Sequence, residues 1–299
     1  LAVGNPPFSK LKGDRNSIAP IIMQNANQHT LNLSELFLEK CIRCSDCIAL
    51  VLNKTILSTD EFEETRQLLR RMKIESIIDF GRNGFTGVSI ETMCMVVYPN
   101  QKPANTFIIN MKYNTRTVKA QKYITDERFP YFIVYRDDAF DAVVDKLTFG
   151  VFDVFRDRQI TKANTVESPE NDSLWVIKAK NINDDGSGVT HIEGYDRYID
   201  AETASKLNVY PYVNNTEIYL TPNMTYNPRV IKNIPGVIPD GSVAVLIPKE
   251  NQRLTERQRL YFSTEEYRRF YLIARNLSTQ SINVDKTSVY FYGVLNDDE

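Results

Sequence analysis

Histidine is scarce in this sequence: His29 and His191 are the only two among 299 residues. An enzyme with a Ser-His-Asp or Cys-His arrangement would need one of them as its base, and neither lies in a nucleophile motif. We therefore expect any chemistry of the chain to run without an imidazole. No segment approaches the roughly 18 consecutive apolar residues of a membrane-spanning helix, so we expect no membrane as a partner.

Neither sign of charge predominates, since 36 Lys and Arg stand against 38 Asp and Glu. The chain therefore has no overall basic excess for nucleic acid, and only local patches can serve a polyanion. Cysteines are few, and Cys41, Cys44 and Cys47 have the spacing of a metal clip. Too few further ligands remain for a zinc or iron–sulfur site, so we predict no metal. The spacing also argues against a secreted disulfide framework and favours a reducing bacterial cytoplasm.

The first hundred residues alternate between helix and strand patterns. Residues 1–4 read as the end of a strand, and a polar loop is expected over residues 9–30. A helix is predicted over residues 31–42, and another opens at the capping box Ser58-Thr59-Asp60-Glu61 with Arg66 on its outer side. Strands are predicted over residues 47–52, 74–80 and 92–98, the first buried on both faces. This order predicts an α/β fold with a mostly parallel sheet.

After Pro103 the segments become shorter, more aromatic and less periodic. A loop is predicted over residues 181–188, and prolines punctuate a strand-rich stretch beyond it. A second capping box at Ser263 opens a helix with Tyr267, Phe270, Tyr271 and Ala274, and the last strand is predicted over residues 288–295. We therefore predict two domains, 1–103 and 104–299, the second of α+β type.

The most informative stretch is Asn5-Pro6-Pro7-Phe8. A residue before proline is driven into extended backbone, and the two prolines have fixed φ and no N–H, so Asn5 and the Pro6 carbonyl are held stiffly after a strand. Two neighbouring acceptors suit an amino group with two protons to donate, and Phe8 offers a face for a flat substrate. An Asx-Pro turn with Phe8 in the core is the structural alternative.

Together with its context, this motif resembles the gamma class of N6-adenine DNA methyltransferases of type II restriction–modification systems. Asn-Pro-Pro-Tyr/Phe is their catalytic motif. Residues 32–40 are similar to the next helix of that family, residues 49–58 to its following strand and loop, residues 60–72 to the helix after that, and residues 80–98 to its last motif. The resemblance covers the first hundred residues in the family's order.

The resemblance implies a function for each matched residue. Asn5 and Pro6 would accept hydrogen bonds from the adenine amino group, with Pro7 holding the turn, so that its nitrogen attacks the methyl group of S-adenosylmethionine. Phe8 would stack on an adenine flipped out of the duplex. Phe85 resembles the loop aromatic beside that base, and Phe37 resembles the residue that packs on the cofactor's adenine. For Phe37 and Phe85, a place in the core is the alternative.

The sequence departs from the family at two points. Asn53 stands where the family usually has proline, which puts the shape of that loop in question. The family's glycine-rich loop and acidic ribose-binding residue belong upstream of the Asn-Pro-Pro motif, and this sequence has neither. We therefore expect the chain to be the C-terminal portion of a longer protein: the C-terminal half of a Rossmann-like methyltransferase sheet, followed by an α+β target-recognition domain.

The second half would then recognise double-stranded DNA, with a cognate restriction endonuclease as a possible further partner. Candidate phosphate contacts are Lys178, Lys180, Arg253, Arg257, Arg259 and Arg268. A solvated surface is the alternative for these residues. Two other functions stay open: a protein-glutamine methyltransferase, which uses a similar motif but lacks so long a C-terminal part, and a DNA-binding specificity module without catalysis.

Overall fold

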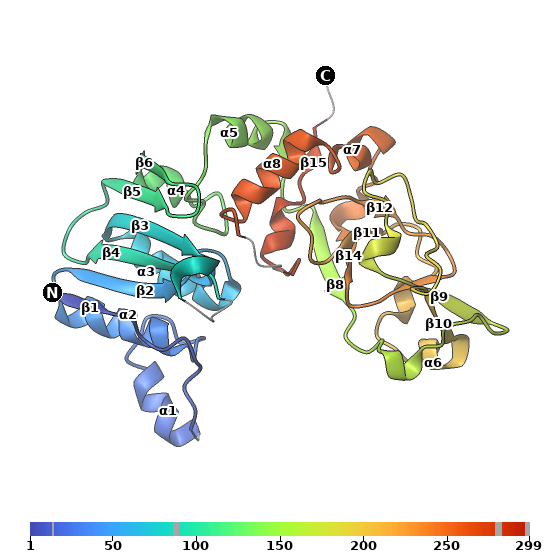
Figure 1. The fold of residues 1–299 in the computed structure, drawn as a ribbon, viewed down its shortest axis with the longest axis horizontal. Helices are drawn as coiled ribbons and strands as arrows, with labels where there is room; N and C mark the ends of the chain where they lie inside the picture. The colour runs from blue at the N-terminus through green and yellow to red at the C-terminus, as the bar shows by residue number, and fades with distance from the viewer. Residues whose placement is uncertain (14, 86–89, 279–282, 297–299) are drawn as a thin grey trace. The chain divides into compact units, whose positions relative to one another are not determined.

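The computed structural model describes residues 1–13, 15–85, 90–278 and 283–296. The chain forms two compact units. Unit 1 comprises Leu1–Arg136 and Ile273–Gln280, and unit 2 comprises Asp137–Leu272 and Ser281–Glu299 (Figure 1). None of the helices in the described residues has the length and apolar character that a membrane span needs.

A sheet of six strands organises unit 1, in the order β1-β2-β4-β3-β5-β6. The strands are β1 (Ala2–Gly4), β2 (Ile48–Asn53), β3 (Lys73–Gly81), β4 (Thr92–Tyr98), β5 (Asn105–Asn110) and β6 (Thr115–Ala120). β4 is antiparallel to both neighbours, and β6 is antiparallel to β5, so the sheet is mixed and not mostly parallel as predicted. Because β5 and β6 extend it, the sheet continues past residue 103.

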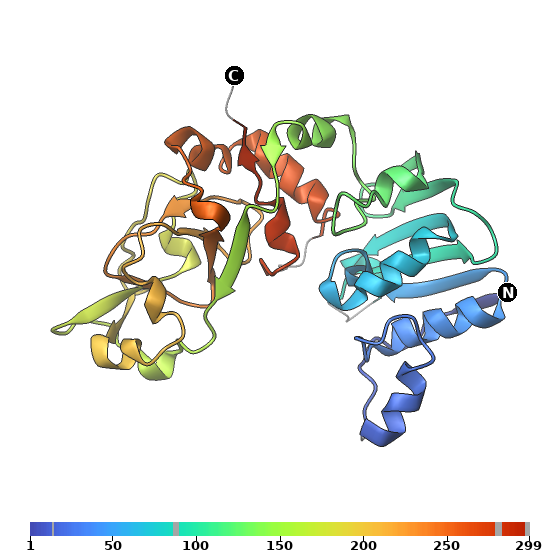
Figure 2. The ribbon, with the colours of Figure 1, turned by 180° about the vertical axis from the view of Figure 1, so that it is seen from behind.

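One face of this sheet is covered by helices. These are α2 (Leu33–Cys44), α3 (Glu63–Arg70) and the short α4 (Gln121–Ile124). In Figure 2, α3 lies in front of the strands. Alternate strand residues pack beneath them, such as Ile48, Leu50 and Leu52 of β2, and form one core with Leu38 and Leu69.

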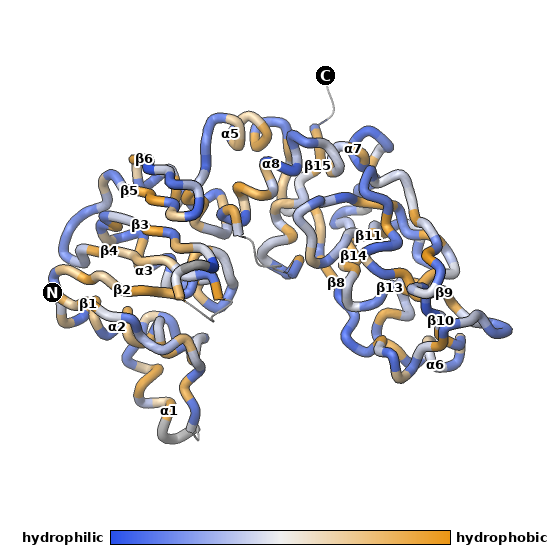
Figure 3. Tube along the Cα trace, in the orientation of Figure 1, coloured by the Kyte–Doolittle hydropathy of each residue, from blue (hydrophilic) through white to orange (hydrophobic). Residues whose placement is uncertain are grey.

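The other face, called here the open face, is apolar but only half-buried to exposed. Cross-strand pairing places its residues side by side. They are Val3, Ala49, Val51, Ile78, Cys94, Val96, Phe107, Ile109 and Val118. β2 is hydrophobic along most of its length (Figure 3), but the prediction that both of its faces are buried is wrong, because no described element covers the second face.

Three local predictions in unit 1 are wrong. The expected loop over residues 9–30 contains the helix α1 (Arg15–Ile22), with Pro20 inside it. The capping box at Ser58 does not form, since the 3-10 turns Lys54–Leu57 and Asp60–Phe62 precede α3. Arg66 points inward instead of outward: it is 1% exposed and donates to the carbonyls of Ile56 and Thr59 at 3.1 and 2.7 Å.

Unit 2 is built from small sheets. The larger one has the order β12-β11-β14-β8, a second has β10-β9-β13, and β15 pairs with β7. The strands are β7 (Leu147–Thr148), β8 (Phe152–Arg156), β9 (Ser173–Ile177), β10 (Arg197–Asp200), β11 (Tyr219–Pro222), β12 (Ile231–Lys232), β13 (Val237–Pro239), β14 (Val243–Pro248) and β15 (Val294–Leu295). The helices are α5 (Asp138–Val144), α6 (Ala201–Ser205), α7 (Glu256–Tyr261) and α8 (Glu265–Ala274).

The end of the chain departs from prediction. Ser288–Phe291 forms a 3-10 turn, so only Val294–Leu295 of the expected last strand is extended and paired. Around α8, Thr264 and not Ser263 accepts the N–H of Tyr267, so the cap lies one residue later than predicted. Tyr267 and Phe270 of this helix are buried.

Candidate active site

The Asn-Pro-Pro-Phe motif leaves the sheet at the carboxyl end of β1. β1 pairs in parallel with β2 up to Gly4 and Leu50, so Asn5 directly follows the last paired residue. Asn5 and Pro7 are exposed, Pro6 is buried and Phe8 is half-buried. The motif thus rests on a buried proline, at the sheet edge where α/β proteins bind ligands.

The chain beyond the motif is fastened to the start of α2. The N–H of Leu33 donates to the carbonyl of Ser9 at 3.0 Å, and the N–H of Leu11 donates to that of Leu31 at 2.7 Å. Asn32 caps α2 by accepting the N–H of Ser34. The motif and the first turn of α2 are therefore held close together.

The Asn5 amide is open to a ligand. It is exposed, and no hydrogen bond joins its side chain to any of the residues described in the structure. An amide turned inward and bonded to backbone would have no acceptor to offer. Asn5 therefore has the accessibility that an acceptor for an external amino group requires.

Phe37 lies one turn into α2 and is not a core residue, since it is 49% exposed. It lines a groove of about 250 Å³. The other lining residues are Leu11, Ile21, Gln24, Asn25, Leu33, Leu36, Lys40 and Arg43. Leu11 and Leu33 take part in the contacts that fasten the motif to α2, so the groove adjoins the motif. An apolar groove with an aromatic wall can hold a flat ring.

Three buried polar residues and the half-buried Tyr135 line the same carboxyl edge of the sheet further along. The Lys54 ammonium, just after β2, lies 2.7 Å from Oδ2 of Asp79 on β3. The Tyr135 hydroxyl donates to the same oxygen at 2.6 Å, and the amide nitrogen of Asn110, at the end of β5, donates to the Tyr135 oxygen at 2.7 Å. Burial, followed by the charge of Asp79, raises the pKa of Tyr135, so its phenol stays protonated. We call these four residues the rim network.

Phe85 follows Asp79 of the rim network along the chain. The N–H of Gly81 donates to Asp79 Oδ1 at 2.9 Å, and the short turn Arg82–Gly84 leads to the half-buried Phe85. At the carboxyl end of β2, the Asn53 side chain accepts the N–H of Thr55 and so caps the turn that begins at Lys54. Asn53 thus shapes that loop without the proline that the family usually has there.

Sequence reasoning missed the rim network. Lys54 and Asp79 are far apart along the chain, and the sheet order places β4 between their strands. A signal was present: polar residues stand at or just beyond the carboxyl ends of three strands that run in one direction, β2, β3 and β5. Such residues gather at one edge of a sheet.

Two of the predicted DNA contacts, Lys178 and Lys180, lie together in unit 2. Their ammonium groups lie 4.2 and 5.4 Å from the ring centroid of Tyr195. Lys178 is half-buried and donates to the Tyr195 carbonyl at 2.5 Å, and burial lowers the pKa of its ammonium. Lys180 is exposed, so it is the more accessible of the two to a phosphate.

The predicted arginines have different surroundings. Arg259 donates to the carbonyls of Gly186 and Val230, which is a structural role, although its contact with DNA stays a prediction. Arg253 is exposed and pairs with Glu217 at 2.7 Å, and Arg268 lies 3.3 Å from Glu265. Arg257 is exposed on α7.

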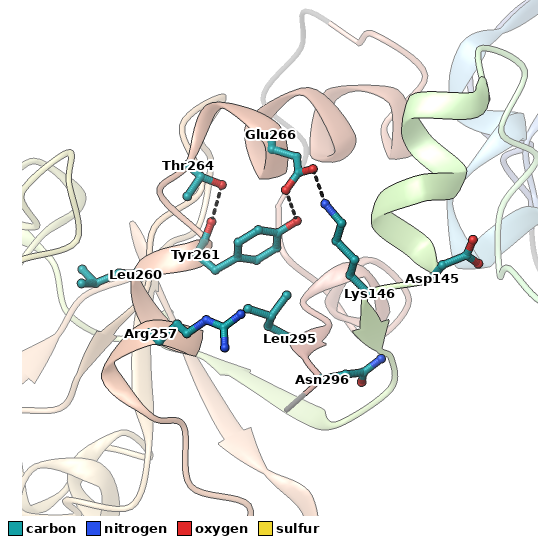
Figure 4. A pocket seen from close by; sticks show the side chains of 9 residues that line it. All are labelled: Asp145, Lys146, Arg257, Leu260, Tyr261, Thr264, Glu266, Leu295 and Asn296. Atoms are coloured by element: carbon teal, nitrogen blue, oxygen red, sulfur yellow. Dashed lines mark hydrogen bonds and ion pairs between the residues drawn. The ribbon is translucent and has the colours of Figure 1, made fainter. Parts of the chain in front are cut away.

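Arg257 lines an open pocket of about 710 Å³ within unit 2 (Figure 4). Across it, Glu266 lies 2.6 Å from the Lys146 ammonium and accepts the Tyr261 hydroxyl at 2.9 Å. Burial raises the pKa of Tyr261. Because the Glu266 carboxylate pairs with the Lys146 ammonium, the pocket carries less positive charge than its lysine and arginine alone would give it.

Several known proteins are similar to this chain. The Eco57I restriction-modification methylase family matches residues 1–85. The search of curated proteins found no match. Among solved structures, the type IIL restriction-modification enzyme MmeI in complex with DNA is 13% identical, with a TM-score of 0.50, and the match covers 83% of this chain and 40% of that chain.

Two further structures match less closely. The type IIG restriction endonuclease BpuSI is 12% identical with a TM-score of 0.41, over 99% of this chain and 47% of that one. A type I restriction-modification methyltransferase subunit from Streptococcus thermophilus is 18% identical with a TM-score of 0.30, over 36% and 25%. This chain spans less than half the length of each of the three proteins.

The likeness to MmeI concerns the fold, while the family match covers the residues of the candidate active site from Asn5 to Phe85. Residues 1–85 match the Eco57I restriction-modification methylase family, and this match confirms the resemblance to restriction–modification methyltransferases that the sequence motifs indicated.

Proposed function

We propose that this chain contributes the catalytic motif and the DNA-recognition part of an S-adenosylmethionine-dependent DNA adenine-N6 methyltransferase of a restriction–modification system. The observation that carries the proposal is the position of Asn5: exposed, unbonded by the described residues, and placed directly after β1 at the carboxyl edge of the sheet. The family match over residues 1–85 supports the reaction class.

Asn5 would act as an acceptor and not as a base. Its amide oxygen and the Pro6 carbonyl would accept hydrogen bonds from the two N–H groups of the adenine amino group. These hydrogen bonds leave the nitrogen lone pair free for attack and stabilise the positive charge that develops on that nitrogen. Phe8 and Phe85 would hold the flipped base by stacking and edge contact, which offsets the cost of removing it from the duplex.

The groove beside Phe37 fits part of the cofactor. S-adenosylmethionine supplies the methyl group when bound. Phe37, Leu11 and Leu33 offer an apolar wall to its adenine ring. No acidic residue is among the described residues that line the groove, so the groove accounts for the adenine ring of the cofactor and not for its ribose.

Unit 2 would bind duplex DNA. The fold likeness to MmeI, which was solved in complex with DNA, covers 83% of this chain and so extends into unit 2. Lys180 and Arg257 are the exposed cations we assign to phosphate contact, because both lie on the surface beside pockets. Phosphate contacts of this kind hold the protein on DNA without reading its sequence.

The test is Asn5→Ala in the complete protein, with transfer of a radiolabelled methyl group to duplex DNA as the assay. Loss of one stabilising hydrogen-bond partner should lower kcat by about 10²-fold or more. Asn105→Ala is the matched control, because Asn105 is also exposed on this sheet but begins β5 at the opposite edge. Nucleoside analysis should find N6-methyladenine as the product.

Two results would contradict the proposal. Unchanged methylation by Asn5→Ala would favour a DNA-binding specificity module whose Asn-Pro-Pro motif is structural. Methylation of a release-factor glutamine in place of DNA would favour the protein methyltransferase.

A further inference from the structure

Lys54 fastens the chain at two points that flank Phe85 in the sequence. Its ammonium lies 2.7 Å from Asp79 Oδ2, and the other oxygen of Asp79 accepts the N–H of Gly81 at 2.9 Å. The backbone N–H of Lys54 donates to the carbonyl of Glu91 at 3.0 Å. One residue at the end of β2 therefore holds the chain both before and after Phe85.

This attachment is buried. The side chains of Lys54 and Asp79 are 7% and 4% exposed, and the Tyr135 hydroxyl completes the shell of the carboxylate. A buried ion pair often adds little net stability compared with apolar residues of the same volume. Removal of one partner, however, leaves the other charge buried without compensation. The pair is therefore better explained by the geometry it imposes than by the stability it adds.

Little freedom remains between Asp79 and Phe85. Gly81 has φ +58° and ψ −140°, a conformation that residues with a Cβ rarely adopt. A Cβ on Gly84 would lie 2.5 Å from Thr92 Oγ1 and 3.0 Å from Phe80 Cβ. The turn from Gly81 to Gly84 is thus held by Asp79 at its start and packed tightly at its end. The position of Phe85 therefore depends on the position of Asp79.

We propose that Lys54 and Asp79 are positioning residues that set Phe85 against the target base. This inference rests on the proposed function, in which Phe85 contacts that base. Lys54 and Asp79 do not touch substrate themselves. They act through Gly81 and the turn that follows it.

The experiment is a double-mutant cycle between Lys54→Met and Phe85→Ala in the complete protein, with kcat and KM for duplex DNA measured well below the unfolding temperature. Lys54→Met should lower kcat by about tenfold or more, with KM changed less than about twofold, because misplacing a contact residue costs rate. In the Phe85→Ala variant the same change should lower kcat by less than about twofold. Lys54 acts through the Phe85 side chain, and that side chain is already absent.

Two further variants complete the design. Lys73→Met removes a 2.6 Å ion pair with Glu75 at the amino end of β3, away from the rim, and should leave kcat near that of wild type. Lys54→Met/Asp79→Asn carries no buried charge and keeps an oxygen for Gly81, so it should regain at least about threefold in kcat over Lys54→Met. It replaces Lys54→Met in the cycle if the single variant does not fold.

If the double variant loses kcat by the product of the two single losses, the positioning role is overturned, since Lys54 would then act independently of Phe85. A loss confined to KM would overturn it as well. Both results leave the proposed function intact, because that function is tested separately by Asn5→Ala.

Discussion

At the scale of single residues, the least expected feature is a pair of carboxyl groups inside unit 1. Glu35 and Glu39 lie on α2 and are 0% and 2% exposed. Glu39 accepts the N–H groups of Ala26 and Asn27 at 2.6 and 2.8 Å, while Glu35 accepts the Thr65 hydroxyl at 2.9 Å. Burial, with a further contribution from Glu39, raises the pKa of Glu35 to about 9.

Glu35→Gln should remove a pH dependence of stability. The Glu35 carboxyl has a pKa of 4.5 when unperturbed and about 9 when folded, so the folded state binds its proton more tightly. Between these values folding takes up a proton, and stability falls by about 1.4 kcal/mol per pH unit as the pH rises. Glutamine keeps the shape of the neutral acid without titrating. Thermal unfolding at about pH 5 and about pH 8.5 should show a gain for Glu35→Gln that is larger at the higher pH.

Glu63→Gln is the control for the loss of one surface carboxylate, since Glu63 is exposed on α3. An equal gain for Glu35→Gln at both pH values would show that Glu35 does not carry its proton in the folded protein.

The residues of the candidate site were predictable to different degrees. Asn5 was found because its neighbours Pro6 and Pro7 restrict the backbone locally, which a sequence shows directly. Lys54 and Asp79 were not found because their contact depends on strand order. Arg66 was placed outward because charge predicts exposure, whereas here its guanidinium donates to the carbonyls of Ile56 and Thr59.

At the scale of elements, the start of α3 replaces a capping box with a buried guanidinium. The chain makes two 3-10 turns before the helix, and Thr59, the N-cap of the second turn, makes no capping bond through its side chain. Arg66 binds the carbonyls of Ile56 and Thr59 from within the helix, and burial lowers its pKa to about 10. Arg66 therefore joins α3 to the segment that follows β2.

Arg66→Ala should destabilise unit 1 by about 2–5 kcal/mol, because it removes the guanidinium that donates to the carbonyls of Ile56 and Thr59 and opens a cavity. Urea unfolding followed by circular dichroism would measure the change. The matched control is Arg71→Ala, an exposed arginine that follows the same helix, which should change stability by less than about 0.5 kcal/mol. Equal effects of the two substitutions would contradict the structural role of Arg66.

Elements with strong periodicity were predicted within a few residues, and the exceptions have physical reasons. β4 was placed at Thr92–Tyr98, as observed, because its apolar run ends at a proline. α1 was missed because Pro20 reads as a helix breaker, although Ile18, Ile21 and Ile22 have helical spacing. The direction of β4 was missed because an apolar run does not reveal its orientation.

At the scale of the whole molecule, the two units divide the proposed work, with the motif in unit 1 and the predicted DNA contacts in unit 2. The groove at Phe37 offers only part of a cofactor site. By isothermal titration calorimetry, this chain alone should therefore bind S-adenosylmethionine more weakly than about 100 μM, since the apolar wall of one ring supplies only a few kcal/mol. Micromolar binding would refute the expectation that the cofactor site needs further residues.

The open face changes how substitutions along the strands should be interpreted. Ile77 points into the helix-covered core, and its neighbour Ile78 points to the open face. In a mutational scan, tolerance to substitution at these adjacent positions would therefore depend on two different properties. Tolerance at Ile77 would report packing within this chain. Tolerance at Ile78, Val51 and Val96 would depend on whether another molecule or segment covers the open face in the cell. Low tolerance at both groups of positions would show that the open face is covered.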